Sequence, residues 1–301
     1  MLSKVVARHL LSVFVVLVAL RVSAAAEPIV VVGKDFTEQG LVAELTRQLL
    51  ASKGFDAQKV QGLSTSEMHA HMRARRGDIY WEYTTTRLSL IYGDRANYDK
   101  GAAYARLREL DLSIGYTWLR PTDINNTYAL AMRTQSSQAL KIATISELFA
   151  AIGRGVNLIV GINKEFAERP DGLEPLERTY GSRFPREIVR QVDTDYIYQA
   201  LRISGVDVGV VFSTDGRISG YDLQILRDDR GFFFNYFLAP IIKTETAQAH
   251  PTLVQILETL SSKLDSATIT RLNAEVDVKR RLIRDVAAEF LKDSGLIQGN
   301  R

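Results

Sequence analysis

IVVVGKDFTEQ, residues 29–39, joins a buried strand to the start of a helix. Residues 29–33 form a short β-branched run, as in a strand that is covered on both faces. Asp35, with Glu38 three residues later, matches a capping box, so we expect a helix to begin here. The apolar stripe of this helix would consist of Leu41, Val42, Leu45 and Leu49. The stretch therefore predicts a β–α unit of an α/β protein.

Strand and helix signals continue to alternate along the chain. Ser64 with Glu67, and Thr144 with Glu147, repeat the capping-box pattern, and Asp195 is expected to cap another helix. Strands are expected at residues 57–62, 78–80, 112–116, 127–132, 158–162, 206–212 and 223–226. No Gly/Ser-rich linker separates the first αβ series from the second, which begins near residue 127. The pattern predicts two α/β lobes joined by short crossovers.

The last part of the chain is expected to be helical. Beyond Pro240 the apolar spacing follows a helical period to the end. Val278, Leu282, Val286 and Phe290 recur every four residues and would lie on one face of the final helix.

Composition excludes several classes of protein. The 301 residues are 46% hydrophobic and 24% charged and include no cysteine, which excludes disorder and a disulfide-stapled scaffold. The formal charge of +3 comes from Lys4, Arg8 and Arg21, because residues 1–26 contain no acid. Without these three, 35 basic residues face 35 acidic ones. A neutral chain gives no electrostatic reason to expect a nucleic-acid partner.

Residues 1–26 have the pattern of a secretory signal peptide. Lys4 and Arg8 precede an 11-residue apolar run at 10–20, and Ala24-Ala25-Ala26 offers a cleavage site before Glu27. The alternative, an uncleaved membrane anchor, is disfavoured because a span needs about 20 apolar residues. We expect a protein exported to a bacterial periplasm, with residues 27–301 as one large domain or two lobes.

Residues for catalysis or metal binding are few. His69 and His71 are two apart on an expected helix and therefore point to different faces, unlike helical metal ligands. The sequence contains no G-x-S-x-G, P-loop or G-x-G-x-x-G motif. Asp215 could act as an acid or base, but no partner for it can be identified. We therefore expect no metal and no cofactor, and an enzyme is possible but not indicated.

Aromatic residues stand where expected strands meet loops. They are Tyr83, Tyr128, Phe212 and Tyr236. Ligands of open α/β sheets bind at such positions, and aromatic faces suit a quaternary ammonium, which is held by cation–π attraction. Each residue taken alone is more often a core or surface aromatic, and spacing alone does not bring the four into one site.

Five segments together resemble one protein family. They read GKDFTEQ (33–39), GDIYWEYT (77–84), NNTYAL (125–130), RPDG (169–172) and FSTDGR (212–217). In this order they closely resemble the substrate-binding proteins of glycine betaine/choline/carnitine ABC importers, over about residues 29–296. The resemblance implies the type II periplasmic-binding-protein fold, with two α/β lobes, two crossovers and a ligand cleft between the lobes. Residues 27–125 plus 237–301 would form lobe one, and residues 126–236 lobe two.

The resemblance also implies a ligand site. Tyr83, Tyr128, Phe212 and Tyr236 match its aromatic box, Asn126 stands near the ammonium, and Lys34, Thr86 and Arg169 match positions that hold the ligand carboxylate. Phe212 replaces a common Tyr, Asn126 an Asp of some relatives, and Thr85 a common Gly.

The implied function is that of the periplasmic binding component of an ABC importer, expected to be a monomer. Its ligand would be a quaternary ammonium solute, glycine betaine first, and its partners a membrane permease with its ATPase. The alternatives are a binding protein for choline, carnitine or another zwitterion, and an enzyme on the same bilobal fold.

Overall fold

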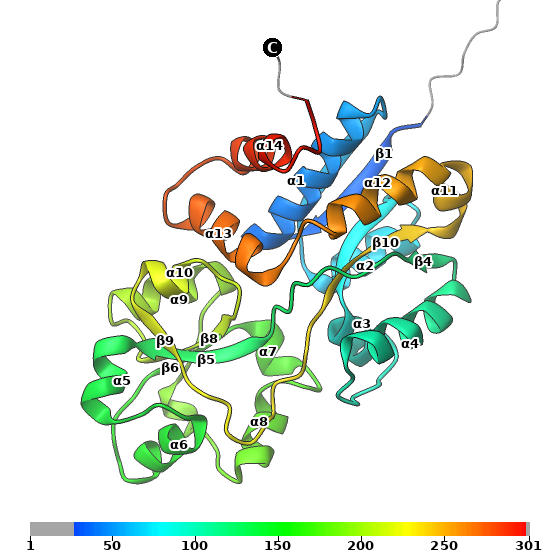
Figure 1. The fold of residues 1–301 in the computed structure, drawn as a ribbon. Coiled ribbons are helices and arrows are strands. Elements are labelled where there is room, and N and C mark those ends of the chain that lie inside the picture. Colours follow the sequence, from blue (N-terminus) through cyan, green and yellow to red (C-terminus); the bar gives the residue numbers. More distant parts are fainter. Residues whose placement is uncertain (1–26, 299–301) are drawn as a thin grey trace, which may run out of the picture.

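The protein consists of two α/β lobes, each built on a five-stranded mixed sheet (Figure 1). The structure is a computed structural model and describes residues 27–298, so the expected signal peptide lies outside the described residues. The first sheet has the order β2-β1-β3-β10-β4, with β1 Ile29–Lys34, β2 Ala57–Leu63, β3 Ile79–Tyr83, β4 Tyr116–Trp118 and β10 Leu238–Lys243. The second has the order β7-β6-β8-β5-β9, with β5 Tyr128–Arg133, β6 Val160–Ile162, β7 Val189–Gln191, β8 Val208–Phe212 and β9 Leu223–Ile225.

Helices cover both sheets (Figure 1). Those of the first lobe are α1 Thr37–Ser52, α2 Thr65–Arg73, α3 Thr84–Ile91, α4 Lys100–Leu112, α11 Thr244–Ala249, α12 Pro251–Ser261, α13 Ser266–Asp277 and α14 Ile283–Asp293. Those of the second lobe are α5 Thr134–Leu140, α6 Ile145–Gly153, α7 Lys164–Glu168, α8 Leu173–Tyr180, α9 Thr194–Arg202 and α10 Arg217–Gly220. Within residues 27–298, no helix combines the length and apolar character needed to cross a membrane.

Residues 29–39 form the centre of the first lobe. Val31 and Val32 of β1 are fully buried, and so is the predicted stripe of α1 that packs on the sheet, with Leu41, Val42 and Leu45 at 0% exposure. Each such side chain contributes about 1.5–3 kcal/mol by leaving water. β1 pairs in parallel with β2 and β3, so the carboxyl ends of these strands meet at one edge.

Two connecting segments join the lobes, one before β5 and one before β10 (Figure 1). Asn125 and Phe237 pair across them as an antiparallel bridge. The expected fold class, two α/β lobes with two crossovers, is confirmed. The lobe bounds at residues 125/126 and 236/237 stay a prediction.

Two expected helix caps are confirmed and two are wrong. Ser64 with Glu67 caps α2, and Thr144 with Glu147 caps α6, each as a complete capping box. Asp35 does not cap α1, because the N-cap is Phe36, without a side-chain hydrogen bond, and Glu38 is drawn into buried contacts. Asp195 lies one residue inside α9, whose N-cap is Asp193.

Three expectations about strands and the C-terminal helices are also wrong. α4 runs on to Leu112, so the strand expected at 112–116 starts only at Tyr116, after the left-handed turn at Gly115 (φ 86°). Pro240 lies inside β10, where its carbonyl accepts from Leu119 N–H, so the helical region begins only at Thr244. The final helix starts at Ile283, and Val278 and Leu282 fall outside it because the chain turns between α13 and α14.

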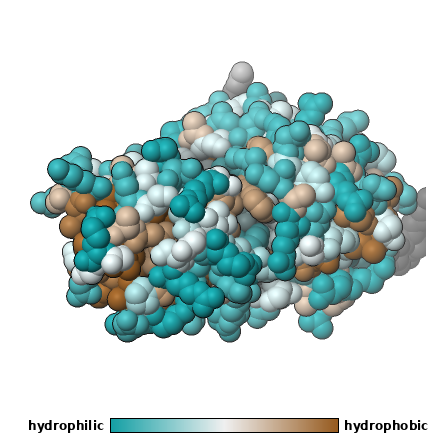
Figure 2. All heavy atoms as spheres, turned by 90° about the horizontal axis from the view of Figure 1, so that it is seen from below, coloured by the Kyte–Doolittle hydropathy of each residue, from teal (hydrophilic) through white to brown (hydrophobic). Residues whose placement is uncertain are grey.

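One face of the molecule is largely hydrophilic (Figure 2). Seen from below, apolar side chains gather mainly at its left end, on the second lobe. The exposed large hydrophobic residues of that lobe include Leu140 at the end of α5 and Ile225 in β9.

Candidate ligand-binding site

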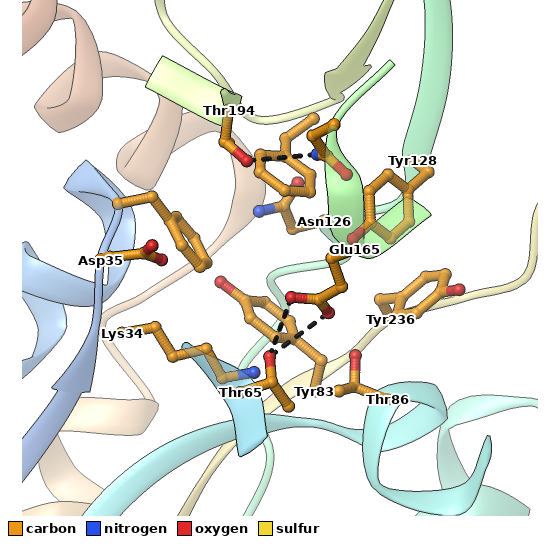
Figure 3. Close-up of a pocket in the computed structure, with 13 residues that line it drawn as sticks. Lys34, Asp35, Thr65, Tyr83, Thr86, Asn126, Tyr128, Glu165, Thr194 and Tyr236 are labelled. Carbon is orange, nitrogen blue, oxygen red and sulfur yellow. Dashed lines mark hydrogen bonds between the residues drawn. The ribbon is translucent and has the colours of Figure 1, made fainter. Parts of the chain in front are cut away.

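A small pocket lies where strand ends of both lobes meet (Figure 3). Lys34 and Tyr83 end β1 and β3 of the first lobe, while Tyr128 begins β5 and Phe212 ends β8 of the second. The cavity measures about 40 Å³. Seven of the eight predicted site residues line it: Lys34, Tyr83, Thr86, Asn126, Tyr128, Phe212 and Tyr236.

Aromatic rings form a continuous wall of this pocket. Tyr128 lies 5.0 Å from Phe212 and 5.8 Å from Tyr236, measured between ring centroids. Phe36 continues the wall, 5.3 Å from Phe212 and 6.3 Å from Tyr83. Because Phe36 links rings from both lobes, the wall has five members, one more than sequence reasoning proposed.

Six lining residues were not proposed from the sequence: Asp35, Phe36, Thr65, Asn163, Glu165 and Thr194. A signal existed for three of them. Asp35 and Phe36 follow Lys34 directly at the end of a strand. Asn163 also follows a strand, β6, and caps α7. Thr65 and Thr194 begin helices, a position that does not by itself point to a ligand.

Lys34 is paired with a buried carboxylate. Its Nζ lies 2.7 Å from Glu82 Oε1, and His69 Nε2 lies 2.7 Å from the other oxygen, Oε2. Burial alone would raise the pKa of Glu82, but Lys34 and the His69 hydrogen bond outweigh it and lower the pKa to about 2. An ammonium group has three N–H donors, so Lys34 keeps donors for a ligand after its bond to Glu82.

Arg169 is the predicted site residue that does not line the pocket. It is buried beneath the aromatic wall, with its guanidinium 5.5 Å from the Tyr128 ring and 5.7 Å from the Tyr236 ring. Its Nε and Nη2 make a bidentate pair with Asp171, each at 2.8 Å. Asp171 in turn accepts a hydrogen bond of 3.0 Å from the Tyr236 hydroxyl. Arg169 thus supports Tyr236 from behind, and its role toward a ligand carboxylate stays a prediction.

Glu38 sits at the centre of a buried network behind the pocket. Its Oε1 accepts hydrogen bonds from the Tyr83 hydroxyl (2.7 Å) and from Asn126 Nδ2 (3.1 Å). Its Oε2 accepts from the Thr214 hydroxyl (2.5 Å) and from Asn273 Nδ2 (3.2 Å). Burial raises the pKa of Glu38, and these four donors oppose the rise. The network joins α1 and β3 of the first lobe to the loop after β8 of the second.

Two contacts close the pocket from opposite lobes. The hydroxyl of Thr65, on α2, donates to Glu165 of α7 at 3.2 Å (Figure 3). Arg169 Nη2 donates to the Ser89 hydroxyl, on α3, at 3.2 Å. The structure is therefore that of a closed cleft.

The remaining candidates for chemistry are held in structural pairs. Asp215 makes a bidentate pair with Arg217, and both are buried. No group of three or more His, Asp or Glu side chains that could hold a metal occurs in the described part of the chain.

Residues 27–293 match a family model described as the substrate binding domain of ABC-type glycine betaine transport system. The chain belongs to this family. It is accordingly the substrate-binding component of an ABC transport system, and the resemblance carried by the five sequence segments is confirmed.

Relatives in this family cover nearly the whole chain. The chain is 36% identical over 280 residues to a glycine-betaine-binding protein of Pseudomonas aeruginosa, covering 91% of this chain and 90% of that one. It is 29% identical to an ergothioneine transport permease/ergothioneine binding protein of Helicobacter pylori, covering 90% of this chain and 48% of that one. Among solved structures, one titled as a glycine betaine/carnitine/choline ABC transporter matches with a TM-score of 0.72 and 26% identity, over 89% of this chain and 99% of that one.

Proposed function

We propose that this protein binds glycine betaine in the pocket between its lobes. The observation that carries the proposal is the combination of five aromatic rings with Lys34 and Thr86 in one small pocket. The rings suit the trimethylammonium group, which offers no N–H and is held by cation–π attraction. The ammonium of Lys34 and the hydroxyl of Thr86 can donate to the carboxylate at the other end.

Binding would favour the closed arrangement of the lobes, because the ligand contacts residues of both. We propose lobes of residues 27–125 plus 237–301 and residues 126–236. A permease and its ATPase in the inner membrane would recognise the closed form. The protein itself would turn nothing over, in keeping with the structural pairs that Asp215 forms with Arg217 and His69 forms with Glu82.

Export to the periplasm is part of the same proposal. It rests on the basic start, the apolar run at 10–20 and the alanines at 24–26. Sequencing the N-terminus of periplasmic material should find Glu27, or a residue close to it, at the start. Recovery of the intact Met1 form from the periplasm would contradict this.

A calorimetric titration of the purified protein with glycine betaine, choline, carnitine and proline tests the ligand. Betaine should bind most tightly, and proline, which lacks a trimethylammonium group, should bind weakly or not at all. Recovery of the ligand unchanged in mass would speak against the enzyme alternative. If none of the four binds, the proposed function is wrong.

Choline is the second candidate, favoured by the negative charge at the pocket. Asp35 and Glu165 line it, and Glu165 also pairs with Arg169. Two further carboxylates, Glu82 and Asp171, pair with Lys34 and Arg169. Desolvation in the cleft raises the pKa of Asp35, and the charge of Glu165 adds to the rise. A cation without a carboxylate would meet less repulsion here than a zwitterion. Choline binding more tightly than betaine in the titration would establish this alternative.

A further inference from the structure

Asn126 carries a buried oxygen that no group of residues 27–298 satisfies. The residue lines the pocket among the aromatic rings and is only 5% exposed (Figure 3). Its Oδ1 accepts no hydrogen bond within the described part of the chain. Buried polar atoms of native proteins are nearly always hydrogen-bonded. This oxygen is therefore the acceptor that Asn126 has left for a bound molecule.

Glu38 determines which atom of the Asn126 amide has no hydrogen-bond partner. The amide Nδ2 donates to Glu38 Oε1 at 3.1 Å. A carboxylate only accepts hydrogen bonds, so a half-turn of the amide would set two acceptor oxygens against each other. Glu38 is itself held by Tyr83, Thr214 and Asn273. The amide is thus fixed with its nitrogen in the wall and its oxygen unpaired.

A fully methylated ammonium makes poor use of such an oxygen. It has no N–H, and the contact left to it is a weak C–H···O interaction. A tertiary ammonium has one N–H, which can donate to Asn126 Oδ1 while two methyl groups remain for the rings. The charge that the rings attract is the same in both cases.

We propose that the pocket also takes N,N-dimethylated ammonium carboxylates, with the ligand N–H donating to Asn126 Oδ1 and with Glu38 as the positioning residue for that oxygen. N,N-dimethylglycine is the simplest member of this class, and at neutral pH its ammonium carries one N–H. The inference rests on the proposed function and adds a second substrate class to it. Asn126 is then a specificity-determining residue, since it distinguishes ligands by the presence of a donor hydrogen.

Calorimetric titrations with dimethylglycine and glycine betaine test the inference. The parent protein should bind the two with affinities within about threefold of each other. Asn126→Leu keeps the side-chain size and removes the oxygen together with the Nδ2 donor to Glu38. It should weaken dimethylglycine by about tenfold or more and betaine by less than about threefold. Asn97→Leu, the same change at an exposed amide outside the pocket, is the matched control and should alter neither affinity.

Glu38→Gln tests the positioning role separately. A glutamine offers a donor as well as an acceptor, so the Asn126 amide becomes free to turn. The affinity for dimethylglycine relative to that for betaine should then fall, in the direction of the Asn126→Leu result, in protein shown to be folded by its thermal melt. An unchanged ratio of the two affinities would contradict the role of Glu38.

The outcomes separate this inference from the proposed function. If the parent binds betaine and rejects dimethylglycine, or if Asn126→Leu weakens both ligands by the same factor, the inference is wrong and the proposed function stands. If the parent binds neither ligand, both are wrong.

Discussion

The three tyrosines of the pocket differ in what their hydroxyl groups do. Tyr83 donates to Glu38 at 2.7 Å and Tyr236 donates to Asp171 at 3.0 Å. No hydrogen bond from the Tyr128 hydroxyl is found among residues 27–298. The rings are therefore equivalent in attracting a cation, but only two of the hydroxyls are tied to carboxylates.

Substitution of each tyrosine by Ala and by Phe separates these two contributions. Ala at any of the three removes a cation–π contact of about 2 kcal/mol together with packing, so affinity should fall more than about tenfold. Phe at Tyr128 should change affinity and stability little. Phe at Tyr83 or Tyr236 should lower the free energy of unfolding by about 1.5–3 kcal/mol, because a buried carboxylate loses a donor. Titration and urea unfolding measure the two effects, and unchanged binding in all three Ala variants would refute the aromatic wall.

Glu82 makes the stability of the protein depend on acid pH. Its pKa of about 2 when folded is lower than the ordinary value of 4.5. A carboxyl with a lowered folded pKa stabilises the native state above pH 4.5, and this stability is lost as the pH falls toward 2. The difference corresponds to roughly 3 kcal/mol. Urea unfolding from pH 7 down to pH 2.5 should show this loss in the parent and a smaller loss in Glu82→Gln.

Glu44→Gln is the matched control for Glu82→Gln. Glu44 also has a pKa lowered to about 2, against its desolvation, by Arg47 and Lys59, but it lies on α1 and does not line the pocket. Both variants should flatten the acid dependence of stability. Only Glu82→Gln should also weaken betaine, because Lys34 loses the carboxylate that holds it. Equal betaine affinity in the two variants would show that the Lys34 pair has no role in binding.

The sequence predicted most of the residues that line the pocket, but not the ion pairs that its charged residues form. The family resemblance brought seven lining residues together. Six of them stand at a strand end or in a connecting segment, and Thr86 lies inside α3. The pairing of Lys34 with Glu82 and of Arg169 with Asp171 could not be foreseen. Glu82 follows Trp81 in a strand that is buried along its whole length. The sequence pattern of a strand gives no reason to expect a buried charge there.

At the scale of the elements, the N-cap of α2 affects the ligand pocket as well as the stability of the helix. Ser64 and Glu67 form the capping box, and the next residue, Thr65, reaches Glu165 across the cleft. Ser64→Ala should cost about 1 kcal/mol of stability and also weaken betaine. Thr144→Ala removes the equivalent cap from α6, which contributes no residue to the pocket. It should cost similar stability and leave betaine affinity unchanged, as urea unfolding and titration would measure. Equal effects of the two variants on binding would contradict a link between this cap and the cleft.

Local sequence patterns predicted helix caps correctly where no tertiary contact competed for the capping side chains. Both Ser/Thr–Glu boxes are exposed or partly buried, so capping had no competitor there. Glu38 follows the same spacing after Asp35, yet tertiary contacts to Tyr83 and Thr214 take its carboxylate. β10 was missed because Pro240 lacks an N–H and usually marks a strand edge or end. Its pairing with β3, more than 150 residues earlier, leaves no local signal.

At the scale of the whole molecule, the alternating strand and helix signals and the family resemblance predicted two lobes, but not how the lobes meet. Behind the pocket the lobes are joined by the Glu38–Thr214 hydrogen bond, and two further polar contacts join them, Thr65 with Glu165 and Arg169 with Ser89. The first pair joins α2 to α7, and the second joins α3 to Arg169, the residue that follows α7. Because each involves a charged partner, each is stronger than a neutral hydrogen bond.

Removing these two hydroxyl groups should open the cleft without touching the aromatic wall. In a Thr65→Ala, Ser89→Ala double variant, Glu165 and Arg169 keep their mutual pair at 3.0 Å, so no charge is left without a partner. The closed form loses two charge-assisted hydrogen bonds that the open form does not make. Betaine should therefore bind about tenfold or more weakly, and every ligand of the pocket should lose affinity by the same factor, since closure is common to all. Small-angle scattering should show a larger radius of gyration for the free variant than for the free parent, with the two converging at saturating betaine. Thr259→Ala, at an exposed position on α12, should behave like the parent in both measurements. A double variant that discriminates between ligands differently from the parent would show that these hydroxyls contact the ligand and do not act through the lobes.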